Sequence, residues 1–86
     1  VYIRGCAWDY DTWARLGADG WCYAEVLPFF KRAENNERGA DDYHGVGGPL
    51  NVTDQKWPNP GSLAWIEAAA SLQIPANPDF NGARFE

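Results

Sequence analysis

The stretch from Gly20 to Gly39 constrains the fold most, because it has more apolar surface to bury than any other segment of the chain. Its apolar residues fall at helical spacing, at positions i, i+3, i+4 and i+7: Tyr23, Val26, Leu27 and Phe30. This spacing predicts an amphipathic helix over about residues 23–34, and Trp21 and Phe29 add aromatic area beside its apolar face. We expect the other elements to pack on this helix.

Pro28 lies inside this predicted helix, beyond its first turn. A proline there removes a backbone donor and crowds the carbonyl of Ala24, so we expect a kink. Cys22 occupies the predicted N-cap position. The polar residues 34–38 should lead out of the helix to Gly39.

Two further helices and one strand follow from local signals. Asp9 or Asp11 can cap a helix over about residues 9–17, which Gly17 ends in the left-handed conformation. Alternation of apolar and polar residues predicts a short strand near 49–53. The pair Asn59-Pro60 is a typical helix start, so we predict a third helix over about residues 60–73, stopped by a proline at position 75.

The predicted fold is therefore mainly α with a small β element (α+β), in one partial domain over residues 1–86 without an internal boundary. A chain of 86 residues buries only about 60–65% of its unfolded surface. Five Trp, four Tyr and four Phe are many for this size, which suggests that part of the aromatic surface covers a missing partner. The absence of Met suggests that residue 1 is not a natural start.

Charge and hydropathy exclude several functions. The net charge of −5 and the seven scattered basic residues argue against nucleic-acid binding. No apolar run approaches the length of a membrane span and no signal peptide is visible, so we expect a soluble, cytoplasmic protein. Cys6 and Cys22 can in principle pair, but the low cysteine content favours two reduced thiols.

His44 is the only histidine and the most obvious acid or base. No nucleophile is linked to it by a motif, and a lone loop histidine is more often hydrogen-bonded or solvated. We therefore predict no catalytic residue in this chain. The acidic residues form no ligand spacing with His44 or the cysteines, so we predict no metal site either.

The run Gly45-Val46-Gly47-Gly48 invites comparison with a phosphate-binding loop. The third glycine of a dinucleotide fingerprint would fall at Leu50, so a glycine-rich turn before a strand is the better interpretation. Asn51-Val52-Thr53 matches a glycosylation acceptor only formally, because it lies in the predicted strand. Exposed aromatic residues can also stack on carbohydrate, although most of them follow the helical stripes.

Several short motifs cover essentially the whole chain, and in sequence order they are Val1-Tyr2-Ile3-Arg4-Gly5, Asp9-Tyr10-Asp11-Thr12-Trp13, Gly20-Trp21, Val26-Leu27-Pro28-Phe29-Phe30-Lys31-Arg32, Glu34-Asn35-Asn36, His44-Gly45, Gly47-Gly48-Pro49-Leu50-Asn51-Val52, Ile66-Glu67-Ala68-Ala69, Ile74-Pro75 and Asp79-Phe80-Asn81-Gly82. Together these motifs resemble the glucose-methanol-choline oxidoreductases, most closely the choline-dehydrogenase-like members. Cys22 and Gln73 depart from the pattern, since the family more often has Ser or Asn at the first position and Gly at the second.

The resemblance implies an FAD-dependent enzyme that transfers a hydride from an alcohol to the flavin. It identifies the chain as an internal segment that follows the flavin-binding N-terminal region. Tyr2 belongs to the tail of the family's first signature and is the one candidate cofactor-binding residue. The dinucleotide-binding motif and the family's catalytic His are both missing, and His44 does not match that His, so we expect the chain alone to bind no FAD and to be inactive.

Two functions therefore remain open from sequence. The chain is a segment of such a flavoenzyme, with the remainder of the enzyme as its partner, or it is a stand-alone interaction or oligomerisation module with an exposed aromatic surface, whose partner is a second copy. The substrate alcohol is not indicated by these residues.

Overall fold

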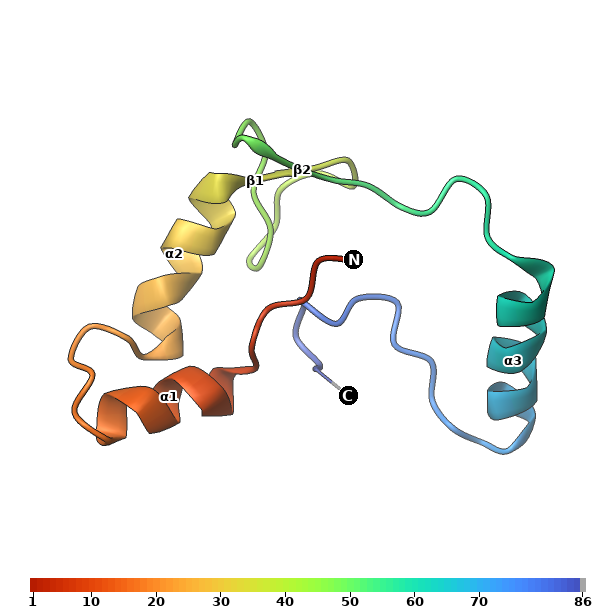
Figure 1. Ribbon diagram of the computed structural model, residues 1–86, viewed down its shortest axis with the longest axis horizontal. Helices are drawn as coiled ribbons and strands as arrows, with labels where there is room; N and C mark the ends of the chain where they lie inside the picture. Colours follow the sequence, from red (N-terminus) through yellow and green to blue (C-terminus); the bar gives the residue numbers. More distant parts are fainter. Residues whose placement is uncertain (86) are drawn as a thin grey trace.

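The computed structural model describes residues 1–85, which form three helices and one pair of short strands. In order, these are Ala7–Arg15 (α1), Tyr23–Ala33 (α2), Glu34–Asn36 (β1), Leu50–Val52 (β2) and Pro60–Ser71 (α3). Helices α1 and α2 lie at one end of the molecule and α3 at the other, with the strand pair between them (Figure 1). The predicted mainly α fold with a small β element is confirmed.

Helix α1 begins two residues earlier than predicted, because Cys6 and not Asp9 or Asp11 is its N-cap. The Asp9 carboxylate reaches back and accepts a hydrogen bond of 2.9 Å from the backbone N–H of Cys6. Asp11 instead holds the start of α2, where its carboxylate accepts the N–H of Tyr23 at 2.9 Å. Gly17 has a φ of 108°, as predicted for the residue that ends the helix.

Helix α2 begins after Cys22, as predicted, and continues through Pro28 to Ala33. The kink at Pro28 stays a prediction. Helix α2 packs on α1 through aromatic side chains, and the Tyr10 ring centroid lies 5.7 Å from that of Phe30. Tyr10 and Val26 are the only apolar side chains classed as buried within residues 1–85. The apolar core is therefore confined to the α1–α2 hairpin.

The exit from α2 differs from the prediction, because Glu34–Asn36 is a strand and not a polar linker. It pairs in parallel with β2, with Glu34 opposite Leu50 and Asn36 opposite Val52. Glu34 and Asn36 are buried while Asn35 between them is exposed. Three polar residues with low strand propensity thus form a strand because its inward side chains enter a polar interior.

Helix α3 has the predicted start, since the Asn59 side chain accepts the N–H of Gly61 at 2.8 Å and Pro60 takes the first position. It ends at Ser71, and Gln73 just beyond it has a left-handed φ of 62°. No residue of α3 is buried. The expectation that the other elements pack on α2 is therefore wrong for α3, whose apolar side chains have too few neighbours at their end of the molecule.

Residues 2–4 meet the C-terminal segment at Asn81, near the middle of the molecule (Figure 1). The backbone N–H of Arg4 donates to the Asn81 side-chain oxygen at 2.8 Å, and the Asn81 amide nitrogen donates to the Tyr2 carbonyl at 3.0 Å. One asparagine thus ties residues 2–4 to the C-terminal segment. Among residues 1–85, no helix is long and apolar enough to cross a membrane.

Candidate functional site

The most distinctive feature of the molecule is a buried group of ionisable and amide side chains, which we call the polar cluster. It consists of Arg4, Glu34, Asn36, His44, Asp79 and Asn81. All of these side chains except that of Asp79 are buried. Buried polar side chains therefore outnumber buried apolar ones in the part of the chain that the structure describes.

Glu34 lies at the centre of the polar cluster and is the one fully buried side chain of residues 1–85, with an exposed fraction of 0%. It accepts hydrogen bonds from Arg4 Nη2 at 2.8 Å and from Asn36 Nδ2 at 3.1 Å. Burial tends to raise the pKa of Glu34, but hydrogen bonds from Asn36 and His44 outweigh burial and leave the pKa below its ordinary value of 4.5. Glu34 is therefore a carboxylate at neutral pH.

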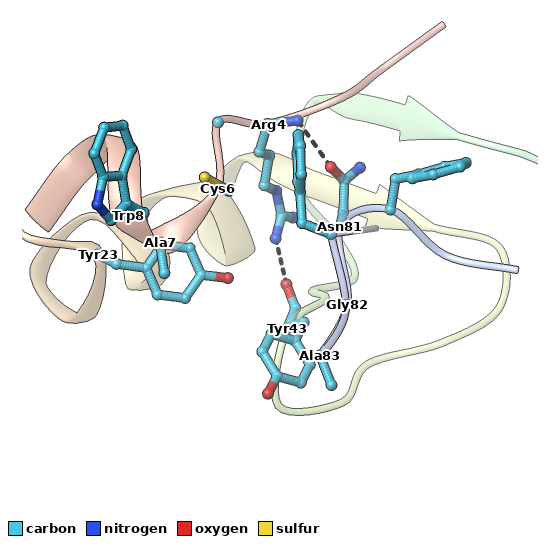
Figure 2. A pocket seen from close by; sticks show the side chains of 12 residues that line it. Arg4, Cys6, Ala7, Trp8, Tyr23, Tyr43, Asn81, Gly82 and Ala83 are labelled. Atoms are coloured by element: carbon cyan, nitrogen blue, oxygen red, sulfur yellow. Dashed lines mark hydrogen bonds between the residues drawn. The ribbon is translucent and has the colours of Figure 1, made fainter. Parts of the chain in front are cut away.

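The Arg4 side chain is held by several hydrogen bonds and a ring contact. Its Nη1 donates to the Tyr43 carbonyl at 2.6 Å, and its Nε donates to the Tyr2 hydroxyl at 3.1 Å. The guanidinium also lies 5.2 Å from the centroid of the Phe30 ring, which is within the range of a cation–π contact. Figure 2 shows Arg4 between Tyr43 and Asn81, with both hydrogen bonds drawn. The buried charge of Arg4 is thus compensated by Glu34, and each of its three guanidinium nitrogens has a hydrogen-bond partner.

His44 bridges the two carboxylates of the polar cluster. Its Nε2 lies 2.7 Å from Asp79 Oδ2, and its Nδ1 lies 3.1 Å from both carboxylate oxygens of Glu34. Burial tends to lower the pKa of His44, but the hydrogen bonds to Asp79 and Glu34 outweigh burial and raise the pKa above its ordinary value of 6.5. Of the two expected states, hydrogen-bonded or solvated, the structure shows the first, and His44 is buried as well.

The loop that carries His44 is fixed by hydrogen bonds within the loop itself. Asp41 Oδ1 accepts the N–H groups of Tyr43 and His44 at 2.8 and 2.7 Å, and the Asp41 N–H donates to the His44 carbonyl at 3.1 Å. This local turn fixes the backbone that carries the imidazole. No Ser, Thr or Cys side chain hydrogen-bonds to His44 within residues 1–85, so the geometry supplies no nucleophile for it.

The glycine-rich run does not form a phosphate cradle. Three of its four N–H groups are already used, because Gly45 donates to Glu34 Oε2, Gly47 to Asn35 Oδ1 and Gly48 to the Glu34 carbonyl. A Cβ on Gly45 would lie 1.9 Å from the carbonyl oxygen of Lys31. These glycines therefore allow the loop to lie against the end of α2, and the predicted glycine turn before a strand is confirmed.

Two hollows flank the polar cluster. One measures about 590 Å³ and is lined by Tyr2, His44 and Asp79 among others. The other measures about 340 Å³ and lies where Arg4 meets Trp8, Tyr23 and the C-terminal segment (Figure 2). Its lining is mainly apolar and aromatic, with Arg4, Gly5, Cys6, Ala7, Trp8, Tyr23, Tyr43, Phe80, Asn81, Gly82, Ala83 and Phe85.

The remaining predicted site residues are also placed. Tyr2 is half-buried, and its hydroxyl accepts the hydrogen bond from Arg4 Nε. Cys6 and Cys22 are free thiols, as predicted. Within residues 1–85 no group of three or more His, Cys, Asp or Glu side chains is close enough to hold a metal ion.

The partners of His44 are not recognisable as a group in the sequence. Glu34 lies in the polar run that is predicted to follow α2, and Asp79 appears only within a motif of the family. The polar cluster joins residues that are up to 77 positions apart, such as Arg4 and Asn81. Spacing between neighbouring residues in the sequence does not indicate such contacts. The one available hint was the presence of ionisable residues within the motifs that resemble a known family.

Comparison with known proteins supplies the context for this geometry. The family model described as GMC oxidoreductase matches residues 1–86. Oxygen-dependent choline dehydrogenases of Brucella ovis and Sinorhizobium fredii are each 44% identical over 86 residues, which is 100% of this chain and 16% of each relative. The corresponding protein of Rhizobium etli is 43% identical over the same length.

Among solved structures, an FAD-dependent oxidoreductase from Chaetomium thermophilum matches with a TM-score of 0.72 and 31% sequence identity. The match covers 83% of this chain and 14% of that protein. The chain thus spans about one sixth of the length of the curated relatives, or 16%.

Proposed function

Because the chain belongs to the GMC oxidoreductase family, we propose that it forms one segment of an FAD-dependent, choline-dehydrogenase-like enzyme that oxidises an alcohol. Its partner is the remainder of that enzyme. The chain alone is inactive, because the described residues contain neither a phosphate cradle nor a positioned nucleophile, and His44 is engaged by Glu34 and Asp79. Residues 1–86 act as one unit in this role, in the cytoplasm.

The distribution of polar and apolar side chains is the observation that carries this proposal. An isolated domain buries apolar residues and exposes charged ones. Here the buried side chains are mainly those of the polar cluster, while Trp8 and Trp65 have exposed fractions of 68% and 78%. A segment with this distribution obtains its apolar surroundings from other parts of a larger fold. The much greater length of the relatives supports the same conclusion.

FAD does not fit the described residues as a self-sufficient site. A flavin dinucleotide needs backbone N–H groups free to bind its pyrophosphate, and those of Gly45, Gly47 and Gly48 are used within the chain. Tyr2 is the residue that we propose lies nearest to the flavin in the complete enzyme. In this segment its position is set by Arg4 and Asn81, through its hydroxyl and its carbonyl.

Flavin absorbance tests this function. The purified 86-residue chain is incubated with FAD, separated from free FAD by gel filtration, and assayed for alcohol-dependent dye reduction. We expect no flavin band and no dye reduction, whereas a full-length choline dehydrogenase carried through the same steps should retain both. A stoichiometric flavin band or turnover by the chain alone would show that it is a complete enzyme unit.

The exposed aromatic side chains favour a second candidate, in which the chain is an interaction or oligomerisation module. Trp21, Val26, Phe29 and Phe30 line an apolar hollow of about 400 Å³ on α2. A second copy of the chain is the partner in this case. Sedimentation velocity tests this second candidate, because a chain that stays monomeric at all concentrations is not an oligomerisation module.

A further inference from the structure

We propose that His44 is a proton-operated clasp: as an imidazolium it bridges Glu34 of β1 and Asp79 of the C-terminal segment, and loss of its proton releases residues 77–82. This role is separate from the proposed oxidoreductase function. It concerns how the two ends of the chain are held together.

The positions of the ring nitrogens carry the argument. Nε2 faces a carboxylate oxygen of Asp79 at 2.7 Å, and Nδ1 faces both oxygens of Glu34 at 3.1 Å. Ionised carboxylates only accept hydrogen bonds, and a neutral imidazole has a single N–H. Only the imidazolium can donate to both carboxylates. In either neutral tautomer one nitrogen lone pair would point at a carboxylate, which is repulsive.

Asn36 offers the one alternative arrangement. Its Nδ2 lies 3.1 Å from His44 Nδ1 and also 3.1 Å from Glu34 Oε1. Donation to the imidazole would require the neutral Nε2–H tautomer. Donation to Glu34 is compatible with the imidazolium and leaves no lone pair facing the carboxylate. The amide orientation itself is fixed, because Asn36 Oδ1 accepts the N–H of Arg38 at 2.9 Å.

Charges from the surrounding segments balance in the protonated state. Arg4 and the imidazolium supply two positive charges, and Glu34 and Asp79 supply two negative ones. Two charged groups at the edge of the cluster act on these residues, Asp41 on His44 and Arg38 on Asp79. Further out, Lys31 acts on Asp41, and Glu37 and Asp54 act on Arg38. Deprotonation of His44 leaves the buried cluster with one uncompensated negative charge.

Asp79 passes this change on to the N-terminal segment. Its Oδ1 accepts the N–H of Asn81 at 3.0 Å, and Asn81 in turn holds the N–H of Arg4 and the carbonyl of Tyr2. When His44 loses its proton, its hydrogen bond to Asp79 is no longer an ion pair, and the turn at residues 79–81 is less firmly held. Release of that turn frees the residues that position Tyr2.

The pH dependence has a definite sign. Because the pKa of folded His44 is raised above 6.5, its stabilising contribution is complete below pH 6.5 and is lost as the pH rises through the folded pKa. Because the pKa of folded Glu34 is lowered below 4.5, its contribution is complete above pH 4.5 and is lost as the pH falls through the folded pKa. The clasp is therefore strongest between about pH 4.5 and 6.5.

Nuclear magnetic resonance of the ¹⁵N-labelled 86-residue chain tests the proposal, because imidazole ¹⁵N shifts distinguish the imidazolium from both neutral tautomers. We expect the imidazolium to persist above pH 6.5, and the backbone amides of Arg4 and Asn81 to titrate with the same midpoint as His44. A neutral Nε2–H tautomer at pH 6.5, or amides that do not follow His44, would overturn the proposal.

Two variants sharpen the test. Asp79→Asn removes one bridged carboxylate and should lower the His44 midpoint by at least about one pH unit. Asp42→Asn removes an exposed carboxylate of the same loop that makes no side-chain hydrogen bond in residues 1–85, and should leave the midpoint unchanged. An equal effect of both variants would contradict the bridge. If Asp79→Asn does not fold, the titration of the unmodified chain still decides the question.

Discussion

The buried ion pair between Arg4 and Glu34 illustrates what single residues contribute here. A buried pair gains little net stability over apolar residues of the same size, because desolvation offsets the attraction. Removal of one partner, however, leaves a buried charge without compensation. Glu34 also accepts the Gly45 N–H, so it fixes a loop as well as a charge. We therefore interpret this pair as a determinant of a unique arrangement rather than of stability alone.

Gln73 gives a prediction at the residue scale. It has a φ of 62°, a conformation that costs an L residue with a side chain about 1 kcal/mol and glycine almost nothing. Gln73→Gly should therefore raise the free energy of unfolding by roughly 0.5–1 kcal/mol, measured by urea denaturation followed by circular dichroism. Gln55→Gly, at an exposed position outside the helices and strands, is the matched control and should not stabilise the chain. A lower free energy of unfolding in Gln73→Gly would show that the backbone of Gln73 is not strained.

The resemblance to the family singled out residue 73, where Gly is more usual, but the predicted helix includes this residue, whereas α3 ends at Ser71. The signal for a helix end is local, and the departure from glycine at residue 73 was visible in the motif before Ile74. The N-caps at Cys22 and Asn59 are local signals as well and are confirmed. Glu34 and Asp79 were not identified, because what makes them distinctive is a shared contact with His44 across 10 and 35 positions of the chain.

At the scale of elements, the glycine loop and α2 are fitted together by backbone contacts. Gly45 and Gly48 lie so close to the last turn of α2 that a Cβ on either would overlap its backbone. Parallel pairing of β1 and β2 depends on this approach, because the connection over residues 37–49 must bring β2 back beside the strand that continues from α2. The glycines of this loop therefore serve to let it pack against α2.

Substitution of two glycines in this loop distinguishes packing from backbone conformation. Gly45→Ala places a Cβ 1.9 Å from the Lys31 carbonyl oxygen and should cost at least about 3 kcal/mol of unfolding free energy or prevent folding. Gly47→Ala meets no atom within 4 Å but keeps a φ of 80°, so about 1–2 kcal/mol is expected. Urea denaturation measures both. Equal losses in the two variants would show that the close approach to α2 is not required.

The elements themselves were predictable to different degrees. Helices α1, α2 and α3 follow from periodicity and caps, with boundaries shifted by one or two residues. Strand β1 was missed, because Glu34, Asn35 and Asn36 have no strand propensity and pair only through tertiary contacts with β2. The prediction that α3 packs on α2 was wrong for a related reason. An apolar stripe indicates that a helix face is buried, but not which element covers it.

At the scale of the whole molecule, the polar interior and the apolar exterior have one common explanation. The motifs that place the chain in its family are spread over its full length, so the sequence was sufficient for that assignment. The arrangement of the polar cluster was not predictable, because it depends on how residues 1–5 and 77–82 meet. In the complete enzyme that we propose, the exposed faces of α1, α2 and α3 become internal surfaces.

The last prediction concerns those faces when the remaining enzyme is absent. Helix α3 exposes Leu63, Trp65 and Ile66, and its only charged residue is Glu67. We expect the chain to self-associate as its concentration rises, because pairing of such faces removes them from water. Burial of a Trp side chain contributes about 2–4 kcal/mol, so Trp65→Glu should weaken association at least about tenfold in sedimentation equilibrium.

Gln55→Glu adds the same charge outside α3 at an exposed polar position, and it should leave the association constant within about twofold. If both variants weaken association equally, net charge is the cause and the α3 face is not the contact. If the unmodified chain stays monomeric at all concentrations, the second copy is excluded as a partner. The faces of α3 and of the α1–α2 hairpin would then be surfaces for the remainder of the enzyme alone, which is the arrangement that the proposed function requires.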